Sequence, residues 1–146
     1  MSSIRLINAF LSREDEQVRL AAAVADSPGF AMAHLLKAWL NLLGTEPAGI
    51  AAARAAHDAA LPHCRTARER GHLAAVGHLA DGRWHEAGRS ILRVTTDQPH
   101  DLLALQAGHQ IDFFTGNARL LRDRIVRAMA EWSDDMPGYH ALLGML

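Results

Sequence analysis

Apolar residues recur along this chain at the three-to-four-residue spacing of helices that bury one face. The stretch from Phe30 to Leu43 is apolar around most of its circumference, which predicts a helix buried on two sides. Thr66-x-x-Glu69 is a capping box that opens another helix. The sequence contains no alternating apolar and polar positions that would predict strands. The pattern predicts helices over residues 12–25, 30–43, 50–61, 67–80, 84–95, 101–115 and 117–132, and a last one from Pro137 onward.

Two of the predicted helix pairs repeat each other at a fixed interval. Gly82 and Gly116 lie 34 residues apart, and so do Ile91 and Ile125. This interval is typical of the tetratricopeptide helix–turn–helix unit. The first copy also has that unit's order of small, large and turn residues, Gly82-x-Trp84-x-x-Ala87-x-x-x-Ile91 followed by Pro99. We therefore expect an all-α fold, a tetratricopeptide-like array of antiparallel helix pairs that forms a short right-handed superhelix.

The chain divides by this interval into one helical-repeat domain over residues 1–146. We expect an N-terminal helix over about 1–27, helix pairs over 28–63, 64–99 and 100–135, and an unpaired last helix over 136–146. Repeat arrays need a polar terminal cap, but this chain ends Ala-Leu-Leu-Gly-Met-Leu. We expect either that the chain is part of a longer protein or that its C-terminal helix self-associates or meets a second chain.

Composition and net charge limit the cellular locations and the classes of binding partner that we expect for this protein. A net charge of −1 gives no electrostatic reason to expect nucleic acid or an anionic membrane as a partner. Cys64 is the single cysteine, so no internal disulfide forms, and it is best explained as a small apolar residue near a helix end. The sequence contains neither an apolar stretch of membrane-spanning length nor an export signal. We expect a cytoplasmic protein.

Several short motifs in the same order resemble the tetratricopeptide-repeat protein 38 family over about residues 28–146. They are Phe30-x-Met32-Ala33, Arg68-Glu69-x-x-His72, Gly82-x-Trp84-x-x-Ala87, Pro99-x-Asp101-x-x-Ala104-Leu105-x-x-x-His109, Phe113-Phe114-x-Gly116, Arg122-Asp123, Trp132 and Tyr139-x-x-x-x-Gly144-Met145. The resemblance implies an all-helical superhelix and no defined reaction. It also implies further repeats beyond the Gly-Met, where this sequence stops.

The repeat register selects candidate binding residues. If Gly82 is the fifteenth residue of its repeat, the fifth positions, which usually face the concave groove, are His72, Gln106 and His140. Gln110 and Phe113 fall on the same predicted face, as does Glu69. Polar groups beside an aromatic ring suit a peptide, a protein partner or a small ligand. The predicted binding residues are His72, Gln106, Gln110, Phe113 and His140.

Simpler roles exist for the same residues. Glu69 is the third residue of the capping box and can close on Thr66. His72 and His140 can be half-exposed surface histidines. A buried pair of His78 with Asp112, which occupy matching places in successive helices, would be structural. The same pair could instead orient a catalytic base.

An enzyme, or an enzyme subunit of small-molecule metabolism, is the alternative function. Its acid–base candidates are the residues that the family resemblance gathers into one region, namely Glu69, His72, Asp101, His109 and Tyr139. This alternative requires that they converge around one cavity.

Nine histidines suggest a metal site, but their spacing does not fit one. His72 and His78 are six residues apart, as are His57 and His63, and such pairs point about 120° apart on a helix. Zinc-binding histidines on one helix face sit three or four residues apart. We expect no metal and no cofactor.

Overall fold

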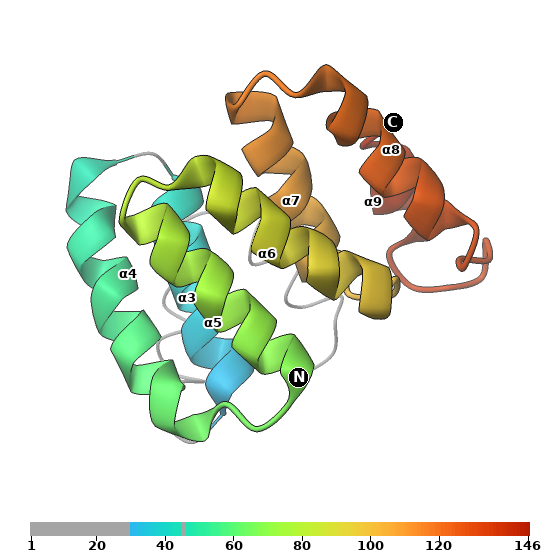
Figure 1. Ribbon diagram of the computed structural model, residues 1–146. Coiled ribbons are helices and arrows are strands. Elements are labelled where there is room, and N and C mark those ends of the chain that lie inside the picture. The colour runs from blue at the N-terminus through green and yellow to red at the C-terminus, as the bar shows by residue number, and fades with distance from the viewer. Residues whose placement is uncertain (1–29, 45) are drawn as a thin grey trace.

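The computed structural model describes residues 30–44 and 46–146, and this part of the chain is all-helical (Figure 1). The helix predicted over residues 12–25 lies outside the described residues. The described elements are α3 (Ala31–Leu43), α4 (Pro47–Ala60), the short 3₁₀ helix η1 (Leu61–His63), α5 (Ala67–Ala80), α6 (Trp84–Asp97), α7 (Leu102–Phe114), α8 (Ala118–Met129) and α9 (Tyr139–Leu143). The all-α prediction is confirmed for this part of the chain.

Consecutive helices pack as antiparallel neighbours, α3 on α4, α5 on α6, and α7 on α8 (Figure 1). These three pairs lie within residues 28–63, 64–99 and 100–135. Helix α5 also packs on both α3 and α4, so the second pair is stacked on the first. Helix α7 packs on α6 and reaches α3. Helix α8 also contacts α6, so the third pair meets the preceding helices mainly through α7 and in part through α8.

The turns inside the second and third pairs have the same geometry. Gly82 and Gly116 both adopt the left-handed conformation, with φ of 77° and 71°, which favours glycine because it lacks a Cβ. The backbone N–H of Arg83 donates to the carbonyl of His78, and that of Asn117 donates to Asp112, each at 2.9 Å. These are the helix-terminating bonds of a Schellman motif. The two glycine turns, which lie 34 residues apart in the sequence, thus have the same backbone structure.

Helix starts follow the capping residues. The Thr66 side chain accepts from the Glu69 backbone N–H, and the Glu69 carboxylate accepts from the Thr66 backbone N–H, so the predicted capping box is present. Asp101 caps α7 by accepting from the Ala104 N–H, and Asn117 caps α8. Each cap satisfies N–H groups that a helix leaves without an internal partner.

The buried apolar residues form two clusters that share α7. The larger cluster includes Trp39 of α3, Val76 of α5, Ile91 of α6 and Ile111 of α7. The smaller cluster joins other α7 residues to α8 and α9, and its buried members are Leu102, Leu105, Ile125, Ala128 and Leu142. Helix α7 therefore separates the two cores and belongs to both.

The C-terminal region differs from expectation in two details. Pro137 does not begin a helix, because α9 starts at Tyr139 after Gly138, whose φ is 92°. Helix α8 ends at Met129, so Trp132 lies beyond it and donates from Nε1 to the carbonyl of Pro99 at 2.7 Å. None of the helices in residues 30–44 and 46–146 combines the length and the apolarity needed to cross a membrane.

Candidate functional site

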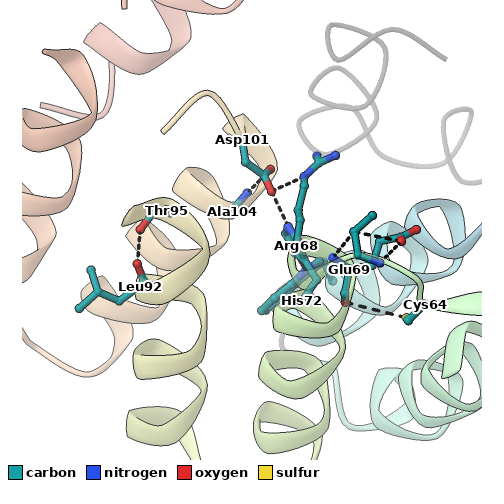
Figure 2. A network of polar contacts seen from close by, with 10 residues as sticks. Cys64, Arg68, Glu69, His72, Leu92, Thr95, Asp101 and Ala104 are labelled. Carbon is teal, nitrogen blue, oxygen red and sulfur yellow. Dashed lines mark hydrogen bonds and ion pairs between the residues drawn. The ribbon is translucent and has the colours of Figure 1, made fainter. Parts of the chain in front are cut away.

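A buried chain of polar side chains joins three helices near the N-terminus of α7 (Figure 2). The indole Nε1 of Trp39 on α3 donates to Nδ1 of His72 on α5 at 3.0 Å. Nε2 of His72 lies 2.7 Å from Oδ2 of Asp101. We call Trp39, His72, Asp101 and Arg68 the Asp101 network.

Asp101 is the centre of this network because three groups converge on its carboxylate. Arg68 donates from Nε to Oδ2 at 2.7 Å, and the Ala104 backbone N–H donates to Oδ1 at 3.0 Å. Burial alone raises the pKa of this carboxyl. The hydrogen bonds from His72 and Arg68, together with the charge of Arg68, outweigh burial and hold the pKa of Asp101 well below its usual range. The group is therefore an anion that its neighbours stabilise.

The hydrogen bonds fix the tautomer of His72 and close its ring to other partners. Since an indole N–H can only donate, Nδ1 of His72 must accept from Trp39. Nε2 then carries the proton and donates it to Asp101. The His72 side chain is 0% exposed. His72 is therefore not the groove-facing residue that the repeat register predicts. It is also not a half-exposed surface histidine, because α3 and α7 cover it.

Glu69 and Cys64 lie beside the network but have local roles (Figure 2). The Glu69 carboxylate accepts from the backbone N–H groups of Arg65 and Thr66 and from the Thr66 hydroxyl. The capping interpretation is thus confirmed. Burial, with a contribution from Glu69, raises the pKa of the Cys64 thiol, although Arg70 opposes the change. A thiol with a raised pKa is a poor nucleophile.

Asp112 pairs with Arg124 and not with His78, so the predicted His78–Asp112 pair is wrong. Nε and Nη2 of Arg124 donate to the two carboxylate oxygens of Asp112 at 2.9 and 3.1 Å. Arg124 is only 2% exposed. Gly108 makes room for it, because a Cβ there would lie 2.6 Å from Nε of Arg124. The repeat register matched positions in successive helices, whereas the true partner is on the paired helix.

The outer side of α7 carries three of the predicted binding residues. Gln106 and Gln110 are half-buried, and Phe113, one turn further, is 67% exposed. Phe114 is 50% exposed, and its ring meets Trp84 of α6 edge-on at 5.6 Å between centroids and Phe113 at 5.7 Å. We call Gln106, Gln110, Phe113, Phe114 and Trp84 the α7 surface.

The remaining candidates lie elsewhere in the C-terminal half. His140 is exposed on α9 beside Tyr139, with ring centroids 5.9 Å apart. His109 is on α7, where burial lowers its pKa. Of the five acid–base candidates, only His72 and Asp101 are joined by a hydrogen bond in the described part of the chain. No three His, Cys, Asp or Glu side chains among residues 30–44 and 46–146 gather as metal ligands would.

The side chains that pair with the two buried carboxylates, Asp101 and Asp112, were not predicted from the sequence. Trp39 and His72 lie 33 residues apart, as do Arg68 and Asp101. This interval, close to the 34 residues between the two glycine turns, was a signal that the residues lie in adjacent helix pairs. Arg124 had no comparable signal, because its contact with Asp112 depends on how α8 is rotated against α7.

No protein-family model matches this chain, and no solved structure matches it.

Proposed function

We propose that this protein is a tetratricopeptide-like binding or scaffold module that holds a peptide or protein partner on the α7 surface. The observation that carries the proposal is the exposure of two adjacent aromatic rings, Phe113 and Phe114, on a helix whose other sides are buried in two cores. Exposed aromatic side chains fixed on a rigid element are typical binding hot spots.

The repeated turns at Gly82 and Gly116 and the stacking of α5 on α3 support a tetratricopeptide-like arrangement. Helix α5 packs on both helices of the first pair, whereas α7 packs on α6 and contacts α3. The third pair therefore packs on the preceding helices differently from the second. The right-handed superhelix and the relationship to the tetratricopeptide-repeat protein 38 family remain parts of this proposal, as does a cytoplasmic location.

The chemistry of the α7 surface favours a peptide-like partner. Phe113 and Phe114 provide apolar area, and Trp84 holds the second ring in place. The amides of Gln106 and Gln110 can both donate and accept hydrogen bonds, as the backbone of a bound peptide requires. A small ligand with an apolar part and an amide-like part would fit the same groups.

Acid–base catalysis is less well supported. Both ring nitrogens of His72 are engaged by Trp39 and Asp101, and its side chain is fully buried. A general base needs a free nitrogen within reach of the substrate. Glu69 is occupied by the cap of α5.

The binding proposal includes self-association through the C-terminal helix. Leu142 is buried in the smaller core and Met145 packs against it, so half of the apolar tail is used inside the chain. Leu143 and Leu146 remain exposed and are the residues through which a second chain would bind.

A photo-crosslinking amino acid placed at Phe113 tests the proposal in cells. We expect one discrete cross-linked protein at this position. The matched control is the same substitution at Ile50, an exposed apolar residue of α4, where we expect no such product. Phe113→Ala should then weaken the purified complex by about 30-fold, as loss of a hot-spot residue does. Equal labelling at the two positions, or none at Phe113, would contradict a specific partner on the α7 surface.

A further inference from the structure

The two ring nitrogens of His72 have hydrogen-bond partners on two different helices. Nε1 of Trp39 on α3 donates to Nδ1 at 3.0 Å. Nε2 lies 2.7 Å from Oδ2 of Asp101, the residue that caps α7. All three side chains are buried. One ring therefore connects α5 to α3 through one nitrogen and to the start of α7 through the other.

These two hydrogen bonds respond differently to a second proton on the ring. In the neutral ring, Nδ1 accepts from the indole of Trp39, which can only donate, and Nε2 donates to Asp101. A second proton can go only to Nδ1. The charged ring still donates from Nε2 to Asp101, but its Nδ1–H then faces the indole N–H. Two donors cannot bond each other, and a buried donor without a partner is costly.

The charged groups around the ring keep the bond to Asp101 in place during this change. Arg68 of α5 donates from Nε to the same Oδ2 at 2.7 Å (Figure 2). Although burial opposes it, the hydrogen bonds from His72 and Arg68 hold the pKa of Asp101 well below its usual range. The carboxylate therefore remains charged when the ring gains its second proton.

The other helices packed on α5 direct their titratable groups elsewhere. On the side of α6, a Cβ built on Gly71, the residue before His72, would meet the uncharged side chain of Val94. The nearby titratable side chains have other contacts, since Glu69 closes the cap of α5, His57 of α4 lies beside Gly77, and His34 of α3 stacks on His63.

We propose that His72 is a pH-sensitive connection between α3 and α5, in which a proton added at Nδ1 breaks the bond to Trp39 and leaves the bond to Asp101. Histidine is the side chain whose ordinary pKa lets its charge change between about pH 5 and pH 8. Acidification therefore weakens the attachment of α3 to α5 while α5 stays bonded to α7. This connection is independent of the proposed partner binding at the α7 surface.

Solution NMR of the unmodified protein follows both bonds. At pH 7.5, long-range ¹H–¹⁵N correlation should show the His72 proton on Nε2 and an unprotonated Nδ1. On lowering the pH to 5, Nδ1 should gain a proton and the Nε2–H resonance should persist. Over the same range, the indole N–H of Trp39 should shift upfield and exchange with water faster relative to that of Trp132, which donates to the carbonyl of Pro99.

Four results of this measurement would overturn the proposal. They are a proton on Nδ1 at pH 7.5, a ring that is still neutral at pH 5, loss of the Nε2–H resonance as the ring becomes charged, and a Trp39 indole that keeps its hydrogen bond after that change. The measurement does not depend on the folding of any variant.

Trp39→Phe tests whether the indole N–H opposes the second proton. Phenylalanine keeps an aromatic ring and removes the donor, so His72 should take up its second proton at a higher pH than in the unmodified protein. Trp84→Phe is the matched control, because it makes the same change at a ring that contacts Phe114 instead, and it should leave the titration of His72 unchanged. An unchanged titration in Trp39→Phe, or an equal shift in both variants, would contradict the proposal.

Discussion

Asp101 combines three roles at a single residue. It caps α7, accepts from His72 of α5, and pairs with Arg68 one turn before His72. A buried carboxylate is costly unless it is paired and fully hydrogen-bonded. Here the pairing groups come from another helix, so this one residue links the start of α7 to α5 and, through His72, to Trp39 of α3.

Asp101→Asn removes the charge of this residue and keeps an oxygen that can cap α7. Asparagine caps helices about as well as aspartate, but its NH₂ group would meet the donors of His72 and Arg68. We expect a loss of about 3 kcal/mol in the free energy of unfolding, measured by urea denaturation. Asp81→Asn, which disturbs the exposed pair with Arg54, should change it much less. Comparable losses in the two variants would show that the Asp101 network does not stabilise the fold.

The lowered pKa of Asp101 also predicts the direction of acid sensitivity. The unfolded carboxyl titrates near its ordinary pKa of about 3.9, and the folded one lies well below it. The contribution of Asp101 to stability is therefore fully present above about pH 4 and decreases as the pH falls below that value. Urea unfolding from pH 7 to pH 2 should show the difference between the unmodified protein and Asp101→Asn shrinking at the acid end. A difference that stays constant with pH would contradict a charge-based role.

At the scale of the elements, the two left-handed glycines give the second and third helix pairs the same kind of turn. Nothing lies within 4 Å of a Cβ built on Gly82 or Gly116, so a substitution there changes backbone strain and not packing. The two turns have the same terminating bonds, and they should respond alike to the same substitution.

Gly82→Ala and Gly116→Ala should each lower the free energy of unfolding by about 1 kcal/mol. The asparagine variants should cost less, because asparagine tolerates the left-handed conformation better than alanine. Thermal denaturation of the four variants measures this. If alanine and asparagine were equally costly at both positions, the loss would not come from the left-handed backbone.

The helices were largely predictable from the sequence, and the polar contacts between them were not. Helix α5 begins and ends where predicted, at Ala67 and Ala80, because a capping box precedes it and a glycine turn follows it. The repeat register predicts that His72 and Phe113 lie on one surface. In the structure, His72 is buried and Phe113 is exposed. Burial depends on which neighbouring helix covers a position, and a one-dimensional pattern does not contain that information.

At the scale of the whole molecule, α7 is the helix on which the proposed function depends. It separates the two apolar cores, carries the α7 surface, and is held at its N-terminus by Asp101. We infer that this hold fixes the α7 surface on the preceding helices, as the proposed binding module requires.

Native-state hydrogen exchange of the unmodified protein and of Asp101→Asn measures whether Asp101 holds α7 in this way. In the unmodified protein, the slowest amides of α5 and α7 should share one free energy of opening, since the Asp101 network links them. In Asp101→Asn, the amides of α7 and α8 should open at lower free energy than those of α3 and α4. A uniform decrease over all these helices, or no decrease in α7, would contradict the claim that Asp101 holds α7 in place.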